Sequence, residues 1–300
     1  MPDQIICTEL LEVHYEVAGP EDGHPVLLVH GWPDCRRTWD LIVPELHQQG
    51  FRSYAMDIRG FGSTQFRHQS TPRSGQLAAL GQDILDFAEV LGLERFAVVG
   101  HDWGARAGYI AANLDGGHRM SSLTALSVGW GTNDPEQQIS LPQAQNYWYH
   151  WLMATPRGAR LVEQDRESFI RYLWQSWNPG FQASAQAVEE AIVAAQNPDW
   201  AAVTLDSYRS RWGWSTPDQR YRGAELAMQA NPLIAVPTLL LHGALDPCNA
   251  PQTSAGKEAL FAADYRREVL ENIGHFPQRQ APERVLAALL PFLAESSKRV

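Results

Sequence analysis

The sequence predicts an α/β fold in which a mostly parallel central sheet is flanked by helices and interrupted by a helical cap. Two observations support this. Short apolar, β-branched runs alternate with helical stretches toward both ends of the chain, and such runs vanish between residues 132 and 235. We therefore assign residues 1–131 and 236–300 to the core and residues 132–235 to the cap. A chain of 300 residues, 44% of them hydrophobic, can bury a large core.

The predicted core elements follow one another as parallel strands with crossover helices. The order along the chain is a strand at 26–30, a helix at 36–49, a strand at 52–57, a helix at 75–91, a strand at 96–100, a helix at 103–113 and a strand at 123–128. After the cap come a strand at 236–242, a helix at 253–261, a strand at 266–270 and a helix from 282 onward. The two halves together predict one sheet.

The cap is predicted from its helical patches and chain breakers, among them Asn178-Pro179-Gly180 and Asn197-Pro198-Asp199. Eight of the eleven tryptophans fall between residues 130 and 214. Because aromatic side chains bring large buried areas, we expect most of these tryptophans to pack the cap onto the core.

Composition excludes several classes of partner. The net charge of −10 and the lack of clustered basic residues oppose binding to nucleic acid or to an anionic membrane, and no apolar run is long enough to span one. The first residues are acidic and alternate in hydrophobicity, unlike a secretory signal, so we expect a cytoplasmic protein. Three scattered cysteines predict neither a disulfide framework nor a metal site, and we expect Cys35 and Cys248 to be bystanders. A small-molecule substrate fits best.

The main chemical motif is Gly100-His-Asp102-Trp-Gly104, which follows the strand at 96–100 and opens the helix at 103–113. This is the context of a nucleophile elbow, here with Asp102 in place of the usual serine. The two glycines permit a sharp turn, and the helix N-terminus favours a negative charge on the central side chain. The simpler interpretation is that Asp102 caps the helix.

An aspartate nucleophile indicates displacement at a saturated carbon. Attack by a carboxylate on an sp³ carbon gives an alkyl ester, which water can split at the carbonyl carbon of the enzyme. A serine would leave an inert ether. The leaving group is then an epoxide oxygen or a halide.

The second step needs a general base, which the C-terminal part of the chain supplies. His275 follows the last predicted strand and Asp246 follows the preceding one. The chain order of nucleophile, acid and histidine is the one expected for an elbow of this kind. Asp246 would orient the imidazole while His275 takes a proton from water.

Two backbone amides are predicted to hold the oxyanion that forms when water adds to the Asp102 ester. Trp32, in the segment His30-Gly31-Trp32-Pro33, and Trp103, directly after the nucleophile, are the candidates. Pro33 is a candidate for a cis peptide bond.

These motifs, together with Asp57-Ile-Arg-Gly60-Phe-Gly62 and Gly274-His275-Phe276, resemble those of the epoxide hydrolase and haloalkane dehalogenase branch of the α/β-hydrolases, over nearly the whole chain. The resemblance implies an α/β-hydrolase fold and a cofactor-independent, metal-free hydrolase. It is greatest to the epoxide hydrolases, which use two cap tyrosines to protonate the departing oxygen.

In this chain Tyr149, seven residues before Pro156, resembles the first cap tyrosine of the epoxide hydrolases, and Tyr208 resembles the second. Tyr147 and Tyr172 are neighbours that could take either place. The resemblance also makes His150 and Trp151, beside Tyr149, candidates for substrate binding together with Trp32 and Trp103.

The same motifs leave two other functions open. In dehalogenases the residue after the nucleophile binds halide, and the Trp103 indole could do so. However, many haloalkane dehalogenases have asparagine at the position of Trp32, and fluoroacetate dehalogenases have arginine at the position of Trp103. A third possibility is a non-catalytic receptor for a small molecule on the same fold. The sequence therefore favours an epoxide hydrolase acting on a mainly apolar epoxide, with haloalkane or haloacid dehalogenation as the alternative.

Overall fold

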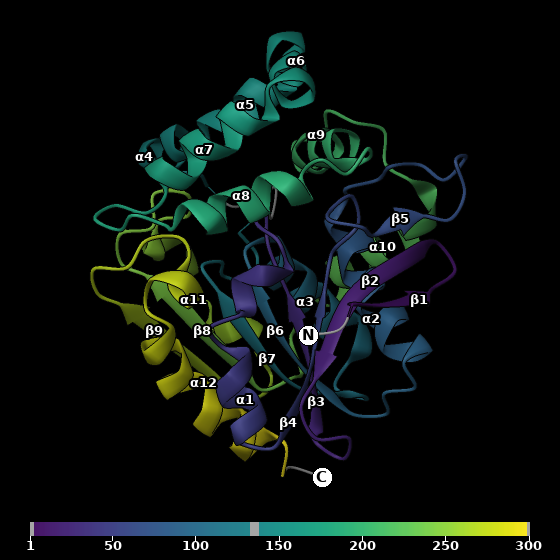
Figure 1. Ribbon diagram of the computed structural model, residues 1–300, viewed down its shortest axis with the longest axis vertical. Helices are drawn as coiled ribbons and strands as arrows, with labels where there is room; N and C mark the ends of the chain where they lie inside the picture. The colour runs from purple at the N-terminus through teal and green to yellow at the C-terminus, as the bar shows by residue number, and fades with distance from the viewer. Residues whose placement is uncertain (1–2, 133–137, 299–300) are drawn as a thin grey trace.

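The protein was analysed as a computed structural model that describes residues 3–132 and 138–298. Its central element is a nine-stranded sheet in the order β1-β2-β4-β3-β6-β7-β8-β9, with β5 pairing β2 (Figure 1). The strands are β1 (Asp3–Cys7), β2 (Leu11–Ala18), β3 (His24–Val29), β4 (Phe51–Met56), β5 (Gln65–Phe66), β6 (Phe96–His101), β7 (Met120–Leu126), β8 (Thr238–Gly243) and β9 (Tyr265–Leu270). All neighbours from β4 to β9 are parallel, and β2 is antiparallel to its partners.

Helices cover both faces of the sheet. They are α1 (Val43–Gln48), α2 (Leu77–Val90), α3 (Trp103–Asp115), α11 (Pro277–Gln280) and α12 (Pro282–Ser296). Side chains of β3 alternate between the faces, so that Val26 and Leu28 pack with α1 and α12, whereas Leu27 and Val29 pack with α2 and α3. The continuous apolar runs of the sequence are therefore strands buried on both sides.

A helical insertion separates β7 from β8 and lies over the carboxyl ends of the strands (Figure 1). Its helices are α4 (Leu141–Asn146), α5 (Trp148–Ala154), α6 (Pro156–Gln164), α7 (Arg166–Ser176), α8 (Ala185–Ala194), α9 (Trp200–Ser210) and α10 (Arg222–Ala230). Ser140, Thr155 and Ser184 cap three of them through side-chain oxygens that accept backbone N–H bonds. Among the described helices, none is long and apolar enough to cross a membrane.

The predicted fold class is confirmed, and the predicted core strands match β3, β4 and β6 to β9 within a few residues. Two predicted helices were wrong. The stretch from 36 to 49 breaks into a 3-10 turn (Arg36–Trp39) and the short α1, which has a proline in its first turn. The stretch from 253 to 261 forms only two 3-10 turns, Pro251–Ser254 and Glu258–Leu260. The antiparallel strands β1 and β2 were not predicted.

Candidate active site

Asp102 stands on a sharp turn between β6 and α3, as the sequence predicts. Its backbone has φ 49° and ψ −109°, a conformation that L-residues rarely adopt and that marks a strained turn. A Cβ on Gly100 would meet the carbonyl of Gly104, and one on Gly104 would meet the carbonyl of Val29, so both positions need glycine. Although Asp102 precedes α3, its side chain makes no capping bond to the helix. The absence of that bond argues against the interpretation that Asp102 only caps the helix.

The Asp102 carboxylate is directed instead at the loop that follows β3. Its Oδ1 accepts the backbone N–H of Trp32 at 3.0 Å, and the peptide bond from Trp32 to Pro33 is cis. Trp103 is the first residue of α3, where backbone N–H groups have no partner within the helix. The Trp32 amide therefore binds the Asp102 carboxyl group, and the Trp103 amide, at the first position of α3, stays a predicted second donor to an oxyanion.

His275 and Asp246 meet Asp102 from the other half of the core. His275 Nδ1 lies 2.8 Å from Asp246 Oδ2, and His275 Nε2 lies 3.7 Å from Asp102 Oδ2. The other oxygen of Asp246 accepts the amides of Cys248 and Asn249 at 2.8 and 3.1 Å. Since all three side chains are buried, they are shielded from bulk water. The hydrogen bond to Asp246 leaves Nε2 of the imidazole as the atom that faces the nucleophile.

The electrostatics of this pair suit a base and its partner. Burial alone would raise the pKa of Asp246, but the neighbouring His275 and His242 outweigh it and hold that pKa well below its usual range. Burial alone would lower the pKa of His275, yet the carboxylates of Asp246 and Asp102 raise it above its ordinary value. Asp246 is therefore ionised at neutral pH, and it strengthens His275 as a proton acceptor.

The insertion brings Tyr149 and Tyr208 to the nucleophile. Their rings are 5.3 Å apart, and both pack on Trp32, Tyr149 stacked at 5.7 Å and Tyr208 edge-on at 5.0 Å. The Tyr208 hydroxyl accepts the Trp103 indole N–H at 3.1 Å. Burial raises the pKa of both tyrosines well above 10, and the Asp102 charge adds to the effect. Both hydroxyls thus keep their protons at neutral pH.

The other candidate residues of the insertion differ in burial. Tyr147 is buried and donates its hydroxyl to Asn249 Oδ1 at 3.0 Å, whereas Tyr172 is 58% exposed. His150 is buried in the same aromatic group, with its ring 4.6 Å from that of Tyr208.

Trp151 lies at the edge of this group, with its ring 6.3 Å from that of His150. It donates to the Ala144 carbonyl at 2.8 Å and packs against Trp212 and Trp214 within the insertion. Its predicted place in substrate binding has no support from these contacts.

Cys248 was wrongly expected to be a bystander. Its Sγ lies 3.1 Å from the Tyr149 hydroxyl, and one ligand atom each from Cys248, Asp102 and His275 lie within 4.8 Å of one another. Within residues 3–132 and 138–298, this is the one group with metal-ligand spacing. A metal there would occupy the nucleophile and the base themselves. The signal for Cys248 was its position two residues after Asp246, on a loop that must reach the site.

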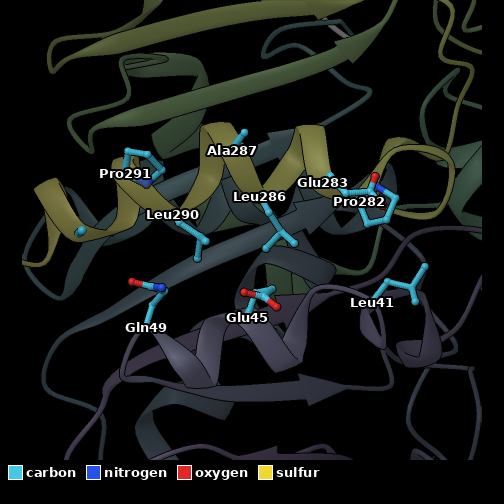
Figure 2. Close-up of a pocket in the computed structure, with 10 residues that line it drawn as sticks. Leu41, Glu45, Gln49, Pro282, Glu283, Leu286, Ala287, Leu290 and Pro291 are labelled. Carbon is cyan, nitrogen blue, oxygen red and sulfur yellow. The ribbon is translucent and has the colours of Figure 1, made fainter.

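A groove elsewhere on the surface has no part in this arrangement. Figure 2 shows it between α1 and α12, with Leu41, Glu45, Leu286 and Leu290 among its lining residues. None of the predicted site residues lines it. The candidate site therefore remains the buried region between the strand ends and the insertion.

The chain matches a known family and is similar to several known proteins. Residues 24–282 match the family described as the alpha/beta hydrolase fold. The chain is similar to Epoxide hydrolase A of Mycobacterium tuberculosis, with 26% identity over 97% of both chains. It is also similar to the Soluble epoxide hydrolase of Corynebacterium sp. (strain C12), with 25% identity over 94% of this chain and 93% of that one.

The chain is also similar to a solved structure over nearly its whole length. A crystal structure from Klebsiella pneumoniae subsp. pneumoniae, whose protein bears the name "putative epoxide hydrolase", superposes with a TM-score of 0.89. It is 32% identical and covers 99% of this chain and 97% of its own. The similarity thus extends over the core and the insertion alike.

Proposed function

The chain belongs to the α/β-hydrolase fold family and is a hydrolase, and on this premise we propose that it is a cofactor-independent epoxide hydrolase. Relatives named epoxide hydrolase, at about 25% identity over nearly the whole chain, support that class of activity. The substrate would be a mainly apolar epoxide, bound between the strand ends and the helical insertion, which we propose acts as a cap spanning residues 132–235. The partners are then one small molecule and water.

The first step opens the epoxide. Tyr149 and Tyr208 donate hydrogen bonds to the epoxide oxygen while the Asp102 carboxylate attacks the adjacent carbon from the opposite side. The C–O bond of the ring breaks, the oxygen takes a proton from a tyrosine, and a β-hydroxyalkyl ester of Asp102 remains. The tyrosines are needed because an alkoxide is a very poor leaving group.

The second step splits the ester. His275, oriented by Asp246, takes a proton from water, and the hydroxide adds to the carbonyl carbon of Asp102. The amides of Trp32 and Trp103 stabilise the oxyanion that forms. The intermediate collapses and the ester C–O bond breaks. The departing oxygen takes the proton held by His275, and the proton left on the Asp102 carboxyl group passes to the tyrosinate, so that diol, tyrosine and carboxylate result. None of these steps calls for a metal or an organic cofactor.

The observation that carries this proposal is the pair of buried, protonated tyrosine hydroxyls beside the nucleophile. Halide departure needs hydrogen-bond donors but no proton, whereas an epoxide oxygen needs both, so a pair of protonated phenols favours the epoxide. In addition, the Trp103 indole that would bind halide already donates to Tyr208. The aromatic surroundings of Trp32, including Phe169 and Trp177 at 5.9 Å, favour a mainly apolar substrate.

Parallel turnover of styrene oxide and 1-bromobutane tests the proposal. Diol is followed by chromatography and bromide by ion detection, with Asp102→Ala as the inactive control. We expect diol from styrene oxide and no bromide. Bromide without diol would establish dehalogenation instead, and tight binding of a ligand with no turnover across a broad panel of substrates would indicate a receptor.

A further inference from the structure

Two arginines are buried at the candidate site, and no carboxylate among the described residues pairs with either of them. Arg106, on α3, donates to Thr132 Oγ1 at 2.7 Å and to Asn249 Oδ1 at 3.3 Å, both neutral acceptors. Arg211, just after α9, donates to Ser207 Oγ at 3.1 Å. Among the described residues, neither forms an ion pair, and the Nε atom of each is buried with no hydrogen-bond partner. The charge of Asp102 favours both cations, but for Arg211 it does not outweigh burial and the like charge of Arg106, so the retention of this pair needs an explanation.

Both arginines adjoin the aromatic residues that surround Tyr208 and Tyr147. Arg211 packs on their rings, and Arg106 is linked to them through a shared hydrogen-bond acceptor. The guanidinium of Arg211 lies over the ring of Tyr208 at 4.5 Å and near that of Trp103 at 5.3 Å. Arg106 shares Asn249 Oδ1 with Tyr147, whose ring stacks on His150 at 4.3 Å.

His150 packs against Tyr208, which also contacts Arg211, and against Tyr147, and it adds a third donor. Its Nδ1 accepts the Trp212 indole N–H at 3.1 Å, so the neutral ring carries its proton on Nε2. That Nε2 is buried and has no partner among the described residues. Burial, and then the charges of Arg211 and Arg106, keep the pKa of His150 well below its ordinary value, which confirms that the ring is neutral.

Three buried donor atoms around one aromatic group, Arg106 Nε, Arg211 Nε and His150 Nε2, have no acceptor among the described residues. We propose that Arg106, Arg211 and His150 form a subsite for a carboxylate group carried by the substrate. Because this rests on the proposed function, the substrate is an epoxide with an apolar or aromatic body and one carboxylate near the ring. The tryptophans would contact the body, while the arginines bind the anion.

The electrostatics agree with this geometry. Burial, and next the like charge of Arg106, lower the pKa of Arg211 from its usual value. A bound anion would relieve both effects, whereas an uncharged substrate would leave the two cations uncompensated. A carboxylate on the substrate is therefore expected to tighten binding and to fix which carbon meets Asp102.

Matched substrates test the subsite. trans-3-Phenyloxirane-2-carboxylate and its methyl ester share one skeleton and differ in charge. We expect kcat/KM for the acid to exceed that for the ester by about tenfold or more, mostly through KM, as one charge-assisted contact provides. Arg211→Met and Arg106→Met should each bring this ratio close to one. Arg209→Met, on the same helix but bonded to the Met153 carbonyl, should preserve it.

If the arginines only balance the charges of Asp102 and Asp246, their loss would slow both substrates equally and leave the ratio unchanged, which would overturn the proposal. A wild-type preference for the ester would do the same. Calorimetric binding of cinnamate, compared with methyl cinnamate, separates this proposal from epoxide hydrolysis. Cinnamate binding that depends on Arg106 and Arg211 in a protein that opens neither epoxide would retain the anion subsite and reject the proposed reaction.

Discussion

At the scale of single residues, the site depends on how charge is distributed among buried groups. Asp102, Asp246 and His275 come from three separate loops, and each is held by a hydrogen bond or a close contact to another. Two carboxylates beside one imidazole keep its pKa high. The Asp102 charge therefore raises the pKa of His275 only in the free enzyme, and in the proposed ester Asp246 alone remains to raise it.

The raised pKa of His275 gives a prediction for the pH profile. Only the neutral imidazole can take a proton from water, so kcat for ester hydrolysis should fall on the acid side of the His275 pKa, which Asp246 still raises after Asp102 has lost its charge in the ester. Asp246→Asn removes the carboxylate that raises this pKa, while burial still lowers it. The acid limb should therefore move to lower pH, with a smaller maximal rate. Single-turnover rates across pH measure both, and an unmoved limb would show that another group controls it.

The two tyrosines give a prediction of rate. Tyr149→Phe and Tyr208→Phe each remove one acid, and each should reduce the rate of epoxide opening about 10²-fold. The double variant should lose more than either single one. Tyr172→Phe, on an exposed side chain, is the matched control and should behave as the wild type. Stopped-flow quenching of tryptophan fluorescence follows the alkylation step, and wild-type rates in both single variants would remove the tyrosines from it.

At the scale of elements, the sharp turn from β6 to α3 holds Asp102, the proposed nucleophile, in position. Gly104→Ala would place a methyl group against the Val29 carbonyl, so the turn must open or the strands must shift. We expect a loss of about 1–3 kcal/mol or more in the free energy of unfolding, together with loss of activity. Gly223→Ala, on α10 with open space around it, should stabilise by about 0.5–1 kcal/mol. Urea unfolding compares the two, and equal stability would contradict the turn's role.

The turn at Asp102 and the residues around it show which features the sequence predicts and which it does not. The turn at Asp102 is local, because glycine spacing and flanking apolar runs report it directly, and so it was predicted within a residue. Cys248 and Arg106 lie close in sequence to Asp246 and Asp102, whereas Arg211 reaches the site only through tertiary packing of the insertion, which leaves no periodic signal in the chain. The N-terminal strands were also missed, because β1 is short and largely exposed, and the alternation of β1 and β2 was read only as the lack of a signal peptide.

At the scale of the whole molecule, the insertion and the core are joined at the catalytic loops. The Trp174 indole donates to the Pro33 carbonyl at 3.1 Å, and its ring stacks on Phe276 at 4.8 Å. The amide of His275 donates to the Trp177 carbonyl at 3.0 Å. The end of α7 thus contacts both the loop that carries Trp32 and Pro33 and the loop that carries His275. In the proposed mechanism, the position of the insertion is therefore coupled to catalysis.

This coupling predicts how the protein responds when one anchor is lost. Trp174→Ala should destabilise the fold by about 3–5 kcal/mol and reduce kcat, because it opens a cavity beside both catalytic loops. Trp214→Ala, at a half-exposed position in the same insertion, should cost less than about 1 kcal/mol. Thermal unfolding and turnover of both variants measure the difference, and normal activity in Trp174→Ala would mean that the insertion does not position these loops.

The central claim is that the Asp102 carboxylate forms an ester that water splits at the enzyme's own carbonyl carbon. A single turnover of styrene oxide by excess enzyme in ¹⁸O-water, followed by mass spectrometry of the peptide that contains Asp102, tests it directly. The account predicts one ¹⁸O atom in Asp102 and none in the diol of that first turnover, since the diol takes its new oxygen from the carboxylate. Label in the diol and none in Asp102 would mean that water attacks the epoxide itself, and would contradict the mechanism.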